Sequence, residues 1–257
     1  MSNTLAGILA ARYALPMAPQ GDSSGIGTER EGSLHRALKL RYAGAGGETE
    51  VIRGGYVCDG VTEDGVMIEV QTGSFGPLKK KIPRLLLQGP VRIIHPIILR
   101  KTIETRDAGG AFLRRRLSPR KGTAWDLFDA LIHAPELPLL RGLSVELALV
   151  EALETRVLDG KGSWRRRGAS IADRRITEHH GILAFNAPRD YRYFLPVKPG
   201  EPFTAKSLGE KAGITPDTAR KALYVLTRIG LAERIGKEGN AYVYRRKRLR
   251  GSATPGL

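Results

Sequence analysis

The sequence predicts an α/β protein with a second, smaller domain near its C-terminus. Three observations support this prediction. Two apolar strands flank a tight turn at residues 56–72, a basic helical segment at 75–88 precedes an apolar strand at 91–98, and two capped helices precede a basic hairpin at 203–245. The chain has 257 residues, which is enough for one large domain or two small ones.

The first observation is the hairpin, in which each strand carries one carboxylate. The turn Thr62-Glu63-Asp64-Gly65 contains the Asp-Gly pair that is typical of hairpins. With Gly65 in the left-handed conformation, the register sets Asp59 opposite Glu69, and Gln71 shares the face of Glu69. Two facing carboxylates repel each other, and a divalent cation reverses that sign. The hairpin therefore predicts a metal site for Mg²⁺ or Mn²⁺.

The spacing of these residues resembles the PD-(D/E)XK nuclease superfamily, which includes restriction endonucleases and Holliday junction resolvases. The family pattern is an acidic residue, a hairpin and then Glu/Asp-x-Lys, which here reads Asp59 followed by Glu69-Val70-Gln71. The family core often has a glutamate on the helix before the hairpin, and Glu31 fits that position. The helix at 75–88 and the strand at 91–98 follow in the family order, so the resemblance covers residues 29–105.

The resemblance implies a restriction-endonuclease-like αβββαβ core that hydrolyses phosphodiester bonds. Asp59, Glu69 and the carbonyl of Val70 would hold the metal, and Glu31 would hold a second metal or a water. The sequence departs from the family at Gln71, where a catalytic lysine is usual, and Lys79 and Lys80 on the next helix would supply positive charge. The alternative is a non-catalytic regulator whose decayed nuclease fold only clamps DNA.

Charge indicates a nucleic-acid partner. The chain has 42 Lys and Arg against 26 Asp and Glu, a formal net charge of +16, and such a surplus attracts phosphate backbones. The basic residues gather in runs at 114–116, 165–167 and 245–248. Aromatic residues make up 6% of the chain, which favours contact with the backbone of duplex or branched DNA over stacking on single strands.

The class of protein is narrowed further by what the sequence lacks. Its single cysteine, Cys58, excludes an internal disulfide and is expected to be buried in a strand. No apolar run approaches the ~20 residues that cross a bilayer, so we expect a cytoplasmic protein without a membrane partner. The family resemblance also allows a homodimer, and an RNA-processing role remains a third alternative.

The middle of the chain gives weaker signals. Residues 123–133 have the apolar spacing of a helix, and 145–153 fit either a strand or a buried helix. A further helix is expected to begin at 170–175. Glu178-His179-His180 lacks the spacing that places two imidazoles on one helix face, so a solvated helix is expected there.

The C-terminal segment 198–247 resembles a winged helix-turn-helix. Thr204 is expected to cap a helix that Gly213 ends, and Thr215-Pro216 to open a second helix that ends at Gly230. Two strands then flank the turn 236–240. The alternative is a winged helix used for protein contact. If the domain binds DNA, the contacting residues come from the exposed start of the second helix and from the hairpin; they are Thr215, Thr218, Arg220, Lys221, Lys237 and Asn240.

The expected division of the chain has five parts. They are a flexible arm (1–28), the nuclease-like core (29–105), a basic and mainly helical connector (106–197), the winged helix-turn-helix (198–250) and a tail (251–257).

Overall fold

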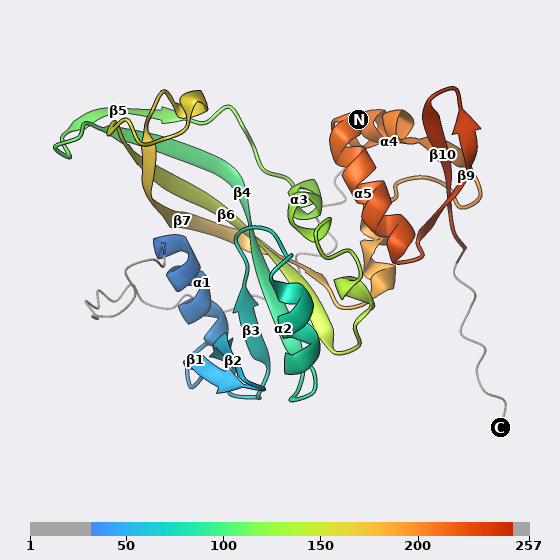
Figure 1. Ribbon diagram of the computed structural model, residues 1–257, viewed down its shortest axis with the longest axis horizontal. Coiled ribbons are helices and arrows are strands. Elements are labelled where there is room, and N and C mark those ends of the chain that lie inside the picture. The colour runs from blue at the N-terminus through green and yellow to red at the C-terminus, as the bar shows by residue number, and fades with distance from the viewer. Residues whose placement is uncertain (1–31, 249–257) are drawn as a thin grey trace. The chain divides into compact units, whose positions relative to one another are not determined.

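The computed structural model describes residues 32–248 and divides them into two compact units (Figure 1). Among the described residues, the first unit contains 32–72, 84–124 and 145–184, and the second contains 73–83, 125–144 and 185–248. The expected flexible arm 1–28, the tail 251–257 and Glu31 lie outside the described residues. None of the helices within residues 32–248 is long and apolar enough to cross a bilayer.

The first unit is built on a mixed sheet that has seven strands within the described residues, in the order β1-β2-β3-β4-β6-β7, with β5 paired to β4. The strands are β1 (Glu48–Arg53), β2 (Tyr56–Val61), β3 (Met67–Val70), β4 (Val91–Arg106), β5 (Phe112–Leu117), β6 (Leu143–Val157) and β7 (Ser170–Phe185). β1, β2 and β3 pair antiparallel, whereas β3 and β4 pair parallel. A parallel pair needs a crossover, and α2 (Leu78–Leu85) lies in the connection between β3 and β4.

The expected hairpin between β2 and β3 is confirmed. Gly65 adopts a φ of +82°, and its N–H donates to the carbonyl of Thr62. Gly60 pairs with Ile68 and Val61 with Met67, which is the register that the sequence predicted. Because that register fixes which side chains share a face, it also fixes the surroundings of both carboxylates.

Helix α1 (Ser33–Ala43) packs on one face of this sheet. Its apolar residues Leu34, Leu38 and Tyr42 are buried against residues of the central strands, namely Ile68, Val70, Ile94, Ala148 and Val150. Strand alternation therefore turns Glu69, which stands between Ile68 and Val70, to the opposite face. Cys58 is buried in β2, as expected.

The expectation of a mainly helical connector at 106–197 is wrong, because the strands β5, β6 and β7 take up more of this segment than its short helices do. The helix expected to begin at 170–175 is also absent, since these residues open β7. The hydroxyl of Ser170 donates to Asp159 at 2.8 Å, and Asp173 accepts the N–H of Ser33 at 3.1 Å, which caps α1. The residues 178–180 lie in β7 and not in a solvated helix.

The second unit contains η1 (Ala124–Asp126), α3 (Leu127–Leu131), η2 (Leu137–Leu139), η4 (Pro188–Phe194), α4 (Ala205–Ala212), α5 (Pro216–Arg228) and a sheet of β8 (Pro202–Thr204), β10 (Ala241–Arg246) and β9 (Ala232–Glu238). Thr204 and Thr215 cap α4 and α5 as expected, each accepting a backbone N–H three residues ahead. Gly213 (φ +67°) and Gly230 (φ +79°) follow the two helices. Phe194 packs edge-on against Phe128 with ring centroids 4.7 Å apart.

Candidate functional site

The predicted carboxylate Asp59 lies where the ladder between β2 and β3 ends. Beyond the Gly60–Ile68 pair, the N–H of Val70 donates to Oδ2 of Asp59 at 2.7 Å. Asp59 thus takes the place of a main-chain acceptor at this point. Nε2 of His35, on α1, lies 3.3 Å from the same oxygen. The carboxylate is therefore fixed by two elements, and its side chain is 22% exposed.

The second predicted carboxylate, Glu69, follows Ile68, the last residue of β3 that the ladder pairs with β2. It is only 3% exposed. Burying a carboxylate costs free energy unless charged or polar groups compensate it. The burial of Glu69 therefore distinguishes it from a glutamate on a solvated strand face. The structure places the two acidic residues that the sequence singled out on adjacent strands, just past the last pair of the β2–β3 ladder.

Gln71 follows β3 at the point where β3 runs beside β4. Its N–H donates to the carbonyl of Ile94, and its own carbonyl accepts from Nδ1 of His95 at 2.5 Å. The parallel register places Glu69 beside Ile93, so His95, two residues further along β4, shares the face of Glu69. His95 is 6% exposed and holds the main chain of Gln71 in position.

The sequence analysis missed His35 and His95 as members of this site. His35 lies in the segment 31–39 that the sequence resemblance compared with a helix before the hairpin, and this position was the available signal. His95 carried no local signal, since the parallel pairing of β3 with β4 alone brings it to Gln71.

The donor set of this site fits a hard divalent cation. Asp59 and Glu69 offer carboxylate oxygens, and the only cysteine, Cys58, is buried in the strand. Mg²⁺ prefers one or two carboxylates and keeps several waters, which a pair of carboxylates and one main-chain carbonyl at Val70 would match.

The predicted lysines Lys79 and Lys80 are exposed on α2, in the second unit. Their proposed contact with a substrate stays a prediction.

The predicted DNA contacts of the second unit begin at the start of α5. The hydroxyl of Thr215 lies 2.9 Å from that of Thr218, as part of the helix cap. Nζ of Lys221 lies 2.9 Å from both Asp129 of α3 and Asp217 of α5. These two carboxylates raise the pKa of Lys221, chiefly through the hydrogen bond from Lys221 to Asp129. The positive charge of Lys221 is thus compensated by two nearby carboxylates, which the sequence did not predict.

The remaining predicted contacts are exposed. Arg220 lies 3.4 Å from Asp217, and its side chain is 63% exposed. On the hairpin, the ammonium of Lys237 lies 5.0 Å from the ring centroid of Tyr242. Asn240 stands in the exposed turn between β9 and β10.

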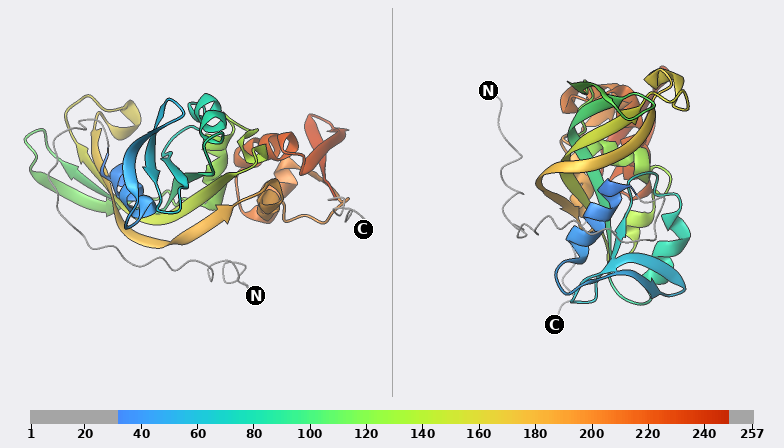
Figure 2. Two further views of the ribbon diagram at one scale, coloured as in Figure 1. Left: turned by 90° about the horizontal axis from the view of Figure 1, so that it is seen from below. Right: turned by 90° about the vertical axis from the view of Figure 1, so that its left-hand side faces the viewer.

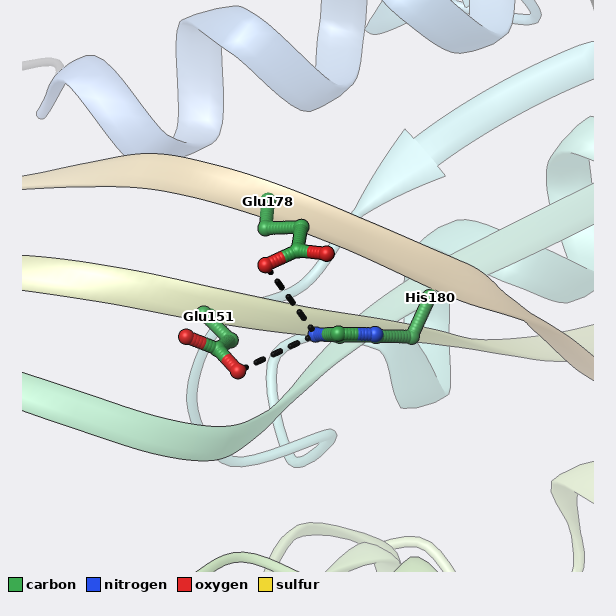
Figure 3. A group of neighbouring side chains, drawn as sticks. All are labelled: Glu151, Glu178 and His180. Carbon is green, nitrogen blue, oxygen red and sulfur yellow. Dashed lines mark hydrogen bonds and ion pairs between the residues drawn. The ribbon is translucent and has the colours of Figure 1, made fainter.

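A second group of ligand-type side chains lies on β6 and β7. Figure 3 shows Glu151 and Glu178 approaching Nε2 of His180, at 3.2 and 3.8 Å. Glu151 also accepts from the guanidinium of Arg100 at 2.8 Å, and this hydrogen bond lowers the pKa of Glu151. The group is therefore an ion-pair network in which Arg100 already supplies positive charge.

Comparison with known proteins shows a matching family and a related protein. A family model described as "Domain of unknown function (DUF8091)" matches residues 32–186. A protein of Treponema pallidum (strain Nichols), described as "Uncharacterized protein", is 30% identical over 222 residues, which covers 86% of this chain and 88% of the relative. No solved structure matches the chain.

Proposed function

The chain belongs to the family of the domain of unknown function DUF8091, and from the geometry of its first unit we propose that it is a metal-dependent endonuclease of the PD-(D/E)XK type. Its reaction would be hydrolysis of phosphodiester bonds in DNA. The observation that carries the proposal is the placement of two carboxylates on adjacent strands just past the β2–β3 ladder: Asp59, which accepts the Val70 N–H, and the buried Glu69.

The order of elements supports the same proposal. Helix α1 is followed by the antiparallel strands β1, β2 and β3, then by α2, and then by β4 parallel to β3. This order resembles the αβββαβ core of the superfamily. The two carboxylates occupy the second and third strands, as the family pattern requires.

The roles of the residues follow from their positions. Asp59, Glu69 and the carbonyl of Val70 would hold Mg²⁺ or Mn²⁺. When bound, such an ion makes water a better nucleophile and offsets charge on the phosphate. The hydrogen bond from Val70 to Asp59 keeps that carboxylate in one orientation. The side chain of Gln71 would orient the attacking water or the phosphate.

Two further roles come from the resemblance alone. Lys79 and Lys80 would contact the scissile strand, and Glu31, outside the described residues, would hold a second metal or a water.

The second unit supports a winged helix-turn-helix as the DNA-binding domain. The capped helices α4 and α5 are followed by the hairpin of β9 and β10, and β8 pairs with β10 to complete a small sheet. In this proposal the start of α5 enters a groove and the hairpin meets the backbone. The contacts would come from Thr215, Thr218, Arg220, Lys221, Lys237 and Asn240.

A non-catalytic DNA clamp is the second candidate, and Gln71 favours it. An amide at this position carries no positive charge to offset the charge of the phosphate. The main-chain hydrogen bonds of Gln71, with Ile94 and His95, do not supply that charge. In this candidate the first unit keeps its fold and binds DNA but does not hydrolyse it.

A cleavage assay separates the two candidates. The purified chain is incubated with linear, branched and single-stranded DNA, with matching RNA, and with Mg²⁺, Mn²⁺ or EDTA. The endonuclease proposal expects cleavage that needs the metal and that Glu69→Gln removes. Binding of DNA by Glu69→Gln should stay close to that of the wild type, because losing a carboxylate also removes repulsion from phosphate. A wild type that cuts nothing under any of these conditions, and yet binds DNA, leaves the clamp as the better account.

A further inference from the structure

Strands β4, β5, β6 and β7 continue past the site as an extension of the sheet. β5 pairs with residues 102–106 of β4, and the N–H of Leu158, just after β6, donates to the carbonyl of Arg106 at the end of β4. β5 and the connection between β6 and β7 therefore flank the same end of β4, and both views in Figure 2 show them at one end of the sheet. We call residues 100–121 and 151–175 the basic extension.

A buried carboxylate organises one side of the basic extension. Glu154 has no exposed surface and contacts Lys101 at 2.9 Å, Arg174 at 2.7 Å and Arg156 at 2.6 Å. Burial alone would raise the pKa of Glu154, but the hydrogen bonds from these three side chains outweigh burial and lower the pKa to about 2. One carboxylate therefore holds three cations, and the group keeps a surplus of positive charge.

A second buried carboxylate repeats this arrangement between β4 and β5. Glu104 is 4% exposed and contacts Arg106 at 2.8 Å and Arg115 at 2.6 Å. Hydrogen bonds from Arg115 and Arg106 lower the pKa of Glu104. Again the cations outnumber the anion that fixes them. Crowded like charges cost stability unless an anion compensates them, so this surplus itself points to an anionic partner.

Further arginines of the basic extension have no acidic partner among residues 32–248. All of them are exposed, and they lie on β5, in the β6–β7 connection and at the start of β7. They are Arg114, Arg116, Arg165, Arg167 and Arg175. The start of α5 differs, since its Lys221 lies against two carboxylates. The basic extension thus presents five exposed arginines without an acidic partner among the described residues, whereas Lys221 of α5 is paired with two carboxylates.

The β6–β7 connection is a loop closed by its own main-chain contacts. Gly162 donates its N–H to Gly168 at 2.8 Å, and a Cβ at Gly162 would lie 1.7 Å from the carbonyl oxygen of Ala169. This closed loop leaves Trp164 82% exposed, with the guanidinium of Arg165 5.5 Å from its ring centroid. A tightly closed loop that exposes a tryptophan and arginines is typical of a contact surface.

We propose that the basic extension binds the phosphate backbone of a nucleic-acid duplex. Arginine suits this role because its guanidinium donates to phosphate in a fixed geometry. The arginines of β5 lie on the edge strand of the basic extension, beside β4. Glu104 and Glu154 hold its cations in place, so less side-chain freedom is lost on binding. The inference rests on the proposed endonuclease function and extends it by giving the first unit its own substrate-binding surface.

Two other accounts of this surface predict different results. Arginines on the edge strand β5 would also prevent edge-to-edge association of sheets; their removal would then cause aggregation and leave affinity for nucleic acid unchanged. An anionic lipid surface would also attract arginines beside Trp164 and the exposed Phe112; binding would then be seen with phosphatidylserine vesicles and not with duplexes.

The test compares two variants that each lose four positive charges. The first carries Arg114→Gln, Arg116→Gln, Arg165→Gln and Arg167→Gln. The matched control carries Arg53→Gln, Arg189→Gln, Lys198→Gln and Lys211→Gln, all exposed positions outside the basic extension. Both sets are made in the Glu69→Gln chain and measured in EDTA by fluorescence anisotropy with labelled DNA and RNA duplexes, so that cleavage cannot interfere.

The first variant should bind duplexes at least about tenfold more weakly than Glu69→Gln alone. The slope of log affinity against log salt should fall by about 0.9 for each phosphate that the variant no longer neutralises. The control should stay within about threefold, because distant charges are screened at moderate salt.

Equal weakening in both variants, or unchanged binding in the first, would overturn the proposal. Binding of the chain to vesicles and to no duplex would overturn it as well. Duplex binding through the basic extension by a chain that never cuts DNA would instead reject the endonuclease and keep this inference. Cleavage by the wild type together with unchanged duplex binding in the first variant would keep the endonuclease and reject this inference.

Discussion

Oδ2 of Asp59 accepts the main-chain N–H of Val70 at 2.7 Å, so a side chain of β2 takes over where the β2–β3 ladder ends. The same residue is the first carboxylate of the proposed metal site. One carboxyl group therefore serves both the fold and the chemistry. Suitable substitutions separate these two roles.

Asp59→Asn and Asp59→Ala should differ in stability and agree in metal binding. The asparagine keeps an oxygen that accepts from Val70, whereas alanine leaves a buried N–H without that acceptor, at a cost of about 1 to 2 kcal/mol. Both variants lose the anionic ligand, so calorimetry should detect Mn²⁺ binding in the wild type and in neither variant. Urea unfolding measures the stability difference. Equal destabilisation of both variants would show that the hydrogen bond to Val70 contributes nothing, and Mn²⁺ binding by Asp59→Ala would remove Asp59 from the metal site.

Gln71→Lys tests the departure from the family pattern. A lysine adds a positive charge beside the phosphate, and the main-chain contacts of residue 71 with Ile94 and His95 do not depend on its side chain. We expect cleavage by Gln71→Lys to equal or exceed that of the wild type. Gln71→Met keeps the side-chain size and removes the amide, and it should lower the rate by about 100-fold if the amide orients a reacting group. Rates are measured in single turnover with excess enzyme. Cleavage by Gln71→Met at the wild-type rate would exclude the amide from the reaction.

Glu154→Gln should destabilise the first unit by about 3 kcal/mol at neutral pH, because it leaves three clustered cations without their anion. The folded-state pKa of Glu154 is about 2, below its usual 4.5. The unfolded chain therefore takes up a proton between these values that the folded chain does not, and the stabilisation present above pH 4.5 is lost as the pH falls towards 2. Thermal unfolding across this window should show a smaller pH dependence in Glu154→Gln than in the wild type. Glu210→Gln, on the exposed surface of α4, is the control that should behave as the wild type.

Asp129→Asn tests whether the start of α5 contacts DNA. This change removes one of the two carboxylates within 2.9 Å of Lys221 and so makes the ammonium more available to phosphate. We expect tighter binding of duplex DNA and a salt slope larger by about 0.9, the value for one more neutralised phosphate. Glu210→Gln removes the same charge without touching Lys221, and it should change affinity less. If both variants bind equally, α5 does not present Lys221 to DNA, and a protein-contact role for this domain gains support.

Local sequence determined the parts of the fold in which nearby residues fix the backbone. The turn at Gly65 sets the register of β2 and β3 because the backbone there needs a positive φ. Helices α4 and α5 begin at Thr204 and Thr215 because each threonine caps its own helix. These features depend on contacts within a few residues, so a sequence reveals them.

The tertiary structure alone decided the features that join distant segments. β7 is a strand because it pairs with β6, and its residues Ser170 and Asp173 bond to Asp159 and to the start of α1, partners that no local pattern reveals. His95 reaches Gln71 only through the parallel pairing of β3 with β4, and Lys221 meets Asp129 across 92 residues of chain. The two carboxylates of the proposed site could thus be predicted from the sequence of one hairpin. The groups that contact them, and the arrangement of the cations in the basic extension, depend on contacts that only the folded chain creates.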